Sequence, residues 1–175
     1  MNKKKKIYKV MERGVIKQID SFSPRKYMNI YNKYLKEIGI DLRGTPRYIH
    51  PSVSFDGKGY PLTHIGNNVV ISRGVLLLNH DYSITCGLRT IGSDVTHEAF
   101  WLKDIFIDDN VFIGANSTIL PGTHIGKNSI VGAGTVVKGN IPEDSIIVGN
   151  PARIISNTDE WARRKENIKD YFFEK

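Results

Sequence analysis

The sequence predicts a mainly β chain folded as a parallel β-helix, and a six-residue repeat carries this prediction. A period of six fits neither a helix, with 3.6 residues per turn, nor a simple strand, with its alternation of two. It fits a triangular coil in which three hexapeptides make one turn and stacked coils bury an aliphatic column. Every sixth residue is aliphatic in two stretches, at Ile65, Ile71 and Leu77, and at Ile107, Ile113, Ile119, Ile125, Val131 and Val137.

Two other positions of the repeat agree with this interpretation. Glycine recurs directly after the aliphatic residue, at Gly66, Gly114, Gly126 and Gly132. The residue four places after it is small or β-branched, as at Val69, Val75, Val111, Ser117, Thr123, Ser129 and Thr135. We expect short strands joined by tight turns, with backbones of neighbouring coils paired about 4.8 Å apart.

The two ends of the chain predict helices instead. Ser23-Pro24 is typical of a helix start and Gly39 of a helix stop, with apolar residues at helical spacing between them. A second amphipathic helix is expected over 158–173, with Trp161, Ile168, Tyr171 and Phe172 apolar. We therefore expect a helical region over 1–44, a β-helix over 45–155 and a helical region over 156–175, the helices capping the solenoid.

The repeat is interrupted twice. A first coil is expected over 49–55, followed by a short loop over 57–61. The longer interruption, 82–104, carries no hexapeptide pattern. Excursions of this length in a compact solenoid are usually functional, so we expect the site near it.

Composition narrows the class of protein. The chain has 175 residues, 40% of them hydrophobic, and a net charge of +7. It contains no apolar run near the about 20 residues that a membrane helix needs. Residues 1–6 are basic but lack the apolar region of a signal peptide, so we expect a cytoplasmic protein, with the lysines of 3–6 forming a solvated tail. A single cysteine, Cys86, excludes an internal disulfide framework and argues against a cysteine-based metal site.

The repeat region resembles hexapeptide-repeat acyltransferases over about residues 45–155, most closely the maltose and galactoside acetyltransferases and the polysaccharide O-acetyltransferases. The resemblance rests on Ile-Asp-Asp-Asn-Val-Phe-Ile-Gly at 107–114, Ile-Leu-Pro-Gly at 119–122, Val-Gly-Ala-Gly-Thr-Val-Val at 131–137 and Gly-Asn-Pro-Ala-Arg at 149–153. It implies a left-handed β-helix, acetyl-CoA as the acyl donor, no metal, and a homotrimer with active sites between subunits. The period is specific for the fold and less specific for acyl transfer.

His80 is the predicted catalytic residue. It follows the regular coil that ends at Leu77–Leu78, just before the long excursion. In the resembling enzymes a histidine at this place removes the proton from the acceptor hydroxyl. The chemistry favours that residue type, because a base that titrates near neutral pH suits proton removal during attack on a thioester. Cys86 offers a covalent acyl-enzyme route instead, but no motif of the family supports it.

Five residues are candidate acceptor ligands. Asp56 stands where the sugar acetyltransferases have an asparagine that binds the acceptor. Asn79 and Asp81 flank His80, although alternation along a strand turns them away from it and a turn role is an open alternative. In the excursion, Trp101 is a candidate for stacking on a sugar ring and His97 for hydrogen bonding; packing of the loop is the alternative for both.

Four residues are candidate ligands of the cofactor. Ala133 and Arg153 match family positions that line the CoA channel, and Ala115 is small enough for the pantetheine arm to pass. Arg153 is expected to pair with a phosphate. Lys138 comes one position earlier than the lysine that family members often carry after the Val-Val step.

Other functions remain open at this stage. A γ-carbonic anhydrase shares the fold, but it needs three histidines on one zinc, and the five here include no close pair in sequence. A non-catalytic scaffold needs neither the long excursion nor Arg153. A nucleic-acid binder rests on net charge alone. We therefore predict an O-acetyltransferase that acts on a sugar or polysaccharide precursor and binds no nucleic acid.

Overall fold

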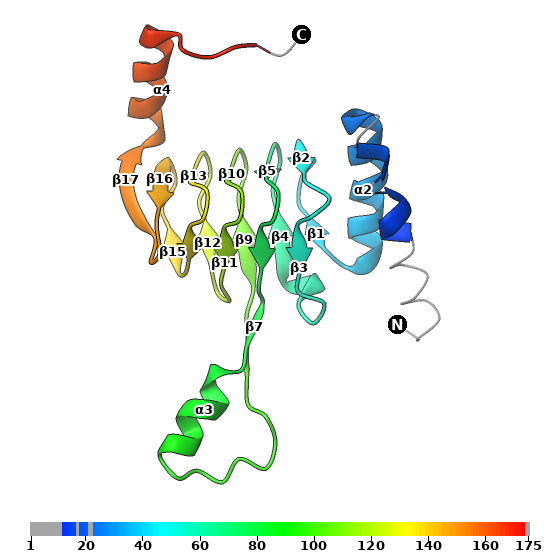
Figure 1. Ribbon diagram of the computed structural model, residues 1–175, viewed down its shortest axis with the longest axis vertical. Helices are drawn as coiled ribbons and strands as arrows, with labels where there is room; N and C mark the ends of the chain where they lie inside the picture. The colour runs from blue at the N-terminus through cyan, green and yellow to red at the C-terminus, as the bar shows by residue number, and fades with distance from the viewer. Residues whose placement is uncertain (1–11, 17, 21–22, 174–175) are drawn as a thin grey trace.

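The computed structural model describes residues 12–16, 18–20 and 23–173, and its main body is a left-handed parallel β-helix (Figure 1). The lysines of residues 3–6 lie outside the described residues. Three sheets form the sides of the triangular coil. Sheet A contains β1 (Asp41–Leu42), β4 (Thr63–Ile65), β9 (Ile105–Ile107), β12 (His124–Ile125) and β15 (Asn140–Ile141). Sheet B contains β2 (Tyr48–Ile49), β5 (Val70–Ile71), β10 (Phe112–Ile113), β13 (Ile130–Val131), β16 (Ser145–Val148) and β17 (Arg153–Asn157). Sheet C contains β3 (Ser54–Phe55), β6 (Leu76–Leu77), β11 (Thr118–Ile119) and β14 (Val136–Val137).

The predicted aliphatic column is confirmed. Ile107 is 2% exposed, and the other five repeat positions from 113 to 137 are completely buried. Strands of successive coils pair in parallel and in register, as where Ile113 lies opposite both Ile71 and Val131. Each coil therefore buries its aliphatic residues against those of the coils above and below, which a single coil has no means of doing.

The small positions of the repeat also point inward and satisfy backbone groups. Ser117 donates to the carbonyls of Gly114 and Gly132 at 2.9 and 3.0 Å. Thr123 donates to the carbonyl of Leu120 at 2.7 Å. Buried hydroxyl groups thus pair with turn carbonyls that the strands leave without a partner, which removes the cost of burying either group alone.

An asparagine ladder stabilises the corner between sheets A and B. Asn68, Asn110 and Asn128 occupy the left-handed region, with φ of 56°, 57° and 58°. Their side chains bond in series: Asn68 donates to Asn110 at 2.9 Å, Asn110 to Asn128 at 3.0 Å, and Asn128 to Asp144 at 2.8 Å. Asparagine tolerates this backbone conformation better than most residues, which explains its recurrence at this turn.

The N-terminal helix is confirmed. Helix α2 (Pro24–Ile38) ends at Gly39, whose φ of 107° is left-handed. Ser23 occupies the N-cap position, although its side chain makes no capping hydrogen bond. Tyr27, Tyr31 and Leu35 are buried against the first coil, so the helix covers that end of the solenoid. The β-helix itself starts earlier than the expected boundary at 45, because β1 at Asp41–Leu42 already pairs with β4.

The C-terminal helix differs from the prediction. Helix α4 (Thr158–Ile168) ends five residues before the expected end, at Lys169 in a left-handed conformation. None of its residues is buried, and Trp161, Ile168, Tyr171 and Phe172 are all exposed. It projects beyond the coils (Figure 1), so the predicted capping by this helix is wrong within a single chain. The edge of sheet B is covered instead by β17, which runs antiparallel to β16.

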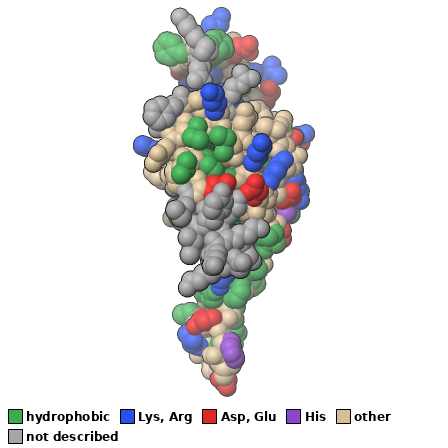
Figure 2. All heavy atoms as spheres, turned by 90° about the vertical axis from the view of Figure 1, so that its right-hand side faces the viewer, with side chains coloured by type: hydrophobic (Ala, Val, Ile, Leu, Met, Phe, Trp, Pro, Cys, Tyr) green, Lys and Arg blue, Asp and Glu red, His purple; other side chains and the backbone are tan. Residues whose placement is uncertain are grey.

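The long excursion forms an arm that projects from the side of the β-helix (Figure 1). We use "the arm" for residues 80–102. Its base is a two-stranded antiparallel ribbon of β7 (His80–Asp81) and β8 (Trp101–Leu102), and helix α3 (Ser83–Thr90) lies beyond it. Hydrophobic and charged side chains are exposed along the arm at the bottom of the view in Figure 2. Among the helices of the described residues, none is long and apolar enough to cross a lipid bilayer.

Candidate active site

The candidate site lies at the corner between sheets C and A, where the arm leaves the second coil. His80 follows β6, and Asp56 follows β3 directly below it in the stack. Phe55 lies opposite Leu77 in the parallel pairing of β3 with β6, and the backbone N–H of Asp56 donates to the carbonyl of Leu77 at 3.1 Å. The register of two successive coils therefore brings the Asp56 carboxylate to the base of the arm.

Asp56 binds the His80 imidazole. Its Oδ2 atom accepts hydrogen bonds from His80 Nδ1 and from the backbone N–H groups of Asn79 and His80, at 3.1 and 3.0 Å for the latter two. Its Oδ1 atom accepts from the backbone N–H of Lys58 at 3.1 Å. The Asp56 side chain is only 4% exposed, whereas that of His80 is 28% exposed. A carboxylate with these donors holds the proton on Nδ1, which leaves Nε2 of a neutral imidazole as the acceptor.

The surroundings of Asp56 favour its ionised form. Burial by itself raises the pKa of Asp56. The hydrogen bond from the His80 imidazole and the backbone hydrogen bond from Lys58 outweigh burial, so the pKa is lowered below its ordinary value. In the part of the chain that the structure describes, no group hydrogen-bonds to His80 Nε2, so this atom is available to a substrate hydroxyl.

Asn79 does not face the site, which corrects its expected role as an acceptor ligand. The residue is completely buried. Its Nδ2 donates to the carbonyls of Leu62 and Lys103 at 3.1 and 3.0 Å, and its Oδ1 accepts from the hydroxyl of Thr63 at 2.9 Å. Asn79 thus fastens the point where the arm leaves the β-helix to the point where it returns. Gly59 packs directly on it, because a Cβ at that glycine would lie 2.1 Å from the Asn79 Cβ.

The ribbon at the base of the arm has two faces, and the predicted acceptor ligands Asp81 and Trp101 lie on the face opposite to His80. His80 lies opposite Leu102 and Asp81 opposite Trp101, so Asp81 and Trp101 point away from His80. Asp81 and Trp101 instead line a pocket of about 290 Å³ with Lys103, Leu120, Pro121 and Lys138. Backbone and side-chain hydrogen bonds from Ser83, together with the charge of Lys138, lower the pKa of Asp81.

The face that carries His80 contains residues that sequence reasoning missed. Tyr82 packs beside His80, Phe100 packs against Tyr82, and the Lys58 ammonium group contacts the rings of Tyr82 and Phe100. Tyr82 shares a face with His80 because it lies two residues further along the extended chain. Side chains alternate between the two faces of a strand, and this alternation is the sequence signal that could have identified Tyr82. Phe100 and Lys58 come from distant parts of the sequence, and nothing in the repeat marks them.

The four candidate cofactor residues lie at different corners. Ala115 and Ala133 follow β10 and β13 at the corner between sheets B and C, and the N–H of Gly134 donates to the carbonyl of Ala115 at 2.8 Å. Arg153 is exposed at the start of β17, next to this corner through the pairing with Val148. Lys138 follows β14 at the corner between sheets C and A, which is the corner of His80. One chain therefore keeps His80 apart from the alanines.

The remaining candidates lie in the arm beyond the ribbon. His97 is exposed, and its Nδ1 lies 3.1 Å from the hydroxyl of Thr96. Cys86 is exposed in α3 as a free thiol. Neither has a contact with His80. In the described residues, no group of three or more histidine, cysteine, aspartate or glutamate side chains is arranged to hold a metal ion.

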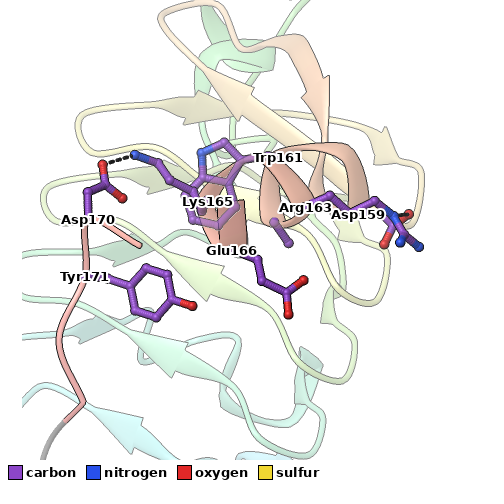
Figure 3. Close-up of a pocket in the computed structure, with 8 residues that line it drawn as sticks. Asp159, Trp161, Arg163, Lys165, Glu166, Asp170 and Tyr171 are labelled. Carbon is purple, nitrogen blue, oxygen red and sulfur yellow. Dashed lines mark hydrogen bonds and ion pairs between the residues drawn. The ribbon is translucent and has the colours of Figure 1, made fainter. Parts of the chain in front are cut away.

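A further pocket, of about 660 Å³, lies on the C-terminal helix and contains none of the predicted catalytic, acceptor-binding or cofactor-binding residues. It is formed by residues of α4 and of the segment after it, including Trp161 and Tyr171, with an ion pair between Lys165 and Asp170 at 2.7 Å (Figure 3). This open concavity belongs to the projecting C-terminus and not to the corner of His80.

Comparison with known proteins identifies the family. A family model described as the hexapeptide repeat of succinyl-transferase matches residues 105–138. The chain is 30% identical over 158 residues to the putative acetyltransferase YvoF of Bacillus subtilis, a match that covers 89% of this chain and 82% of that protein. The chain belongs to the hexapeptide-repeat acetyltransferases.

Other relatives of this acetyltransferase agree with that assignment. It is 27% identical over 165 residues to the galactoside O-acetyltransferase of Lactococcus lactis, covering 85% of this chain and 72% of that one. A galactoside acetyltransferase solved in complex with coenzyme A aligns with a TM-score of 0.56 at 23% identity, over 95% of this chain and 86% of the other. That structural likeness supports the β-helix fold of the acetyltransferase.

Proposed function

We propose that this acetyltransferase transfers an acetyl group from acetyl-CoA to a hydroxyl group of a sugar or polysaccharide precursor, with His80 as the general base. The observation that carries the proposal is the geometry of His80. The buried Asp56 carboxylate holds its Nδ1, and Nε2 is free at the base of the arm.

The reaction then needs one base and no covalent acyl-enzyme. His80 Nε2 accepts the hydroxyl proton as the acceptor oxygen attacks the thioester carbonyl carbon. Collapse of the tetrahedral intermediate breaks the carbon–sulfur bond, and the CoA thiolate takes the proton from the imidazolium. Asp56 stabilises the imidazolium through its hydrogen bond to Nδ1 and keeps the ring oriented.

The choice of acetyl-CoA and of a sugar is supported by the relatives. One is named for O-acetylation of galactosides, and one related structure contains coenzyme A. Features of this chain fit such a donor. Gly134 has open space around its Cα and Ala133 is exposed beside it, so an extended pantetheine arm has room along this corner. Among the described residues, Arg153 has no carboxylate partner and is free to pair with a CoA phosphate.

The separation of the two corners supports a shared site. The thioester must reach His80, yet Ala115 and Ala133 lie on another edge of the β-helix, at the corner between sheets B and C, which we call the alanine corner. A neighbouring subunit in a closed threefold ring brings its alanine corner to the His80 corner of the first. We therefore include a homotrimer in the proposal, with Asp81, Trp101 and Lys138 facing the subunit boundary.

The test is release of CoA thiol in the presence of sugar acceptors. His80→Ala should lower kcat by about 10²–10⁴-fold, which is the usual contribution of a general base. Binding of acetyl-CoA should survive, because the base acts on the acceptor. Cys86→Ala is the matched comparison. Full turnover by His80→Ala together with loss of turnover in Cys86→Ala would replace direct transfer with an acyl-enzyme route.

A further inference from the structure

A cationic and aromatic cluster lies on the same face of the ribbon as His80. The rings of His80 and Tyr82 meet edge-on with centroids 5.4 Å apart, and Phe100 lies 5.0 Å from Tyr82. The Lys58 Nζ atom is 4.8 Å from the centroids of both Tyr82 and Phe100, and it donates a hydrogen bond to the Tyr82 hydroxyl. The Tyr82 hydroxyl and the Phe100 ring hold the ammonium group at this position.

The positive charge of Lys58 is not neutralised locally. In the part of the chain that the structure describes, no carboxylate forms an ion pair with the Lys58 ammonium group. The nearest carboxylate in sequence, Asp56, is committed to His80 and to the backbone N–H groups at the start of the arm. The Lys58 side chain is exposed, so its remaining N–H donors face solvent beside the base.

We propose that Lys58 binds an anionic group on the acceptor, so that the substrate is a sugar acid or a sugar phosphate. This inference rests on the proposed function, because it places the acceptor hydroxyl at His80. The ammonium group and the imidazole both contact the Tyr82 ring, at 4.8 and 5.4 Å from its centroid. An acceptor sugar that places a hydroxyl on His80 then presents its carboxylate or phosphate to Lys58, on the same side of the ribbon.

The phosphates of CoA are a poor alternative partner for Lys58. The thioester carbonyl must meet the acceptor hydroxyl next to His80, and the pantetheine arm separates the thioester from the phosphates. A cation beside the base is therefore reached by the acceptor and not by the phosphate end of the donor. The exposed Arg153, near the alanine corner, is the residue that we expect to bind the CoA phosphates.

The decisive experiment compares glucose derivatives that carry a carboxylate, a phosphate or a neutral hydroxyl at carbon 6. CoA release is measured with methyl glucuronide, glucose 6-phosphate and methyl glucoside, for the native protein and for Lys58→Met. The native protein should prefer one or both anionic sugars, and Lys58→Met should lower kcat/KM for them by about 10- to 100-fold. Turnover of the neutral glucoside should fall less than that of either anionic sugar, because it carries no anionic group for Lys58 to bind. The two anionic arms distinguish a carboxylate from a phosphate.

Two controls separate this inference from the proposed function. Lys127→Met removes an exposed lysine that pairs with Glu143 at 3.1 Å on another side of the coil, and it should leave every acceptor unchanged. Binding of the same three sugars is also measured by NMR titration in His80→Ala, where turnover is removed but Lys58 remains. Stronger binding of an anionic sugar that depends on Lys58 supports the inference even if no acceptor is turned over. Equal binding of charged and neutral sugars, or an equal loss for both in Lys58→Met, overturns it.

Discussion

The Asp56 carboxylate holds Nδ1 of His80 across two successive coils of the β-helix. Because the same carboxylate oxygen also accepts from the backbone N–H groups of Asn79 and His80, the ring and the start of the arm are oriented by one buried group. The Asp56 side chain is only 4% exposed, so we propose that it positions His80, in place of the expected contact with the acceptor.

Asp56→Asn should lower kcat while sparing the KM for acetyl-CoA. An amide at this position places an N–H group against the N–H donors that now meet the carboxylate, and it no longer stabilises a charged imidazolium. We expect a loss approaching that of removing the base, about 10²–10⁴-fold. Steady-state kinetics at saturating acetyl-CoA measure this change.

A matched control is available on sheet A. Asp108 accepts a hydrogen bond from His124 at 2.9 Å, but this pair is exposed and distant from the arm. Asp108→Asn should leave kcat unchanged. Partial recovery of turnover in Asp56→Glu, together with a changed dependence of kcat on pH in Asp56→Asn, would support positioning. Equal losses in Asp56→Asn and Asp108→Asn would point to a general loss of stability.

Acidification should expose the contribution of Asp56 to stability. Its pKa is lower in the folded protein than the about 3.9 of an unfolded chain, so ionised Asp56 stabilises the folded state above that value. This stabilisation is lost as the pH falls from about 4 through the folded-state pKa. Urea unfolding of native protein and Asp56→Asn over this range should show a difference in free energy that shrinks on acidification. Asp41 and Asp81, whose pKa values are also lowered, are present in both proteins and cancel.

The β-helix could be predicted from the sequence because its energetics repeat. An aliphatic side chain is buried in the same way at every sixth residue. Positions such as Ile113 and Ile125 therefore indicate the fold without reference to the rest of the chain. Helix α2 could be predicted from its local end signals, Pro24 and Gly39. The end of α4 could not, since none of its residues is buried and its apolar side chains remain exposed.

The candidate site was only partly predictable because its contacts cross between coils. His80 could be found by its position before the arm. Asp56 lies 24 residues away, and only the register of Phe55 with Leu77 reveals that it contacts the imidazole. Asn79 resembles a site residue in sequence, yet burial commits its amide to the backbone.

Shortening one residue of the aliphatic column should be costly. Ile119 is completely buried between coils, and Ile119→Ala should lower the free energy of unfolding by about 2–5 kcal/mol through lost burial and the cavity left behind. Ile91 is 76% exposed in the arm, so Ile91→Ala should change it by less than about 0.5 kcal/mol. Denaturant unfolding at one fixed protein concentration measures both. Equal changes in the free energy of unfolding for the two variants would contradict a special contribution of the aliphatic column to stability.

A shared active site should be demonstrated by subunit mixing. His80→Ala removes the base, and Ala133→Trp fills the exposed alanine corner proposed for the pantetheine arm. Each variant alone should be inactive. Light scattering should give a mass near three chains for both, because neither change touches the aliphatic column.

When the two variants are co-expressed, each mixed trimer should regain one intact site, since one interface joins a native His80 to a native alanine corner. With random assembly about a quarter of native activity should return. The comparison is a double variant that carries both changes on one chain, mixed with itself, which should remain inactive. If each site lies within one chain, mixing should restore no activity, because every chain then carries one of the two substitutions in its own site. Recovery in the mixture with none in the double variant would place His80 and Ala133 of different subunits in one site.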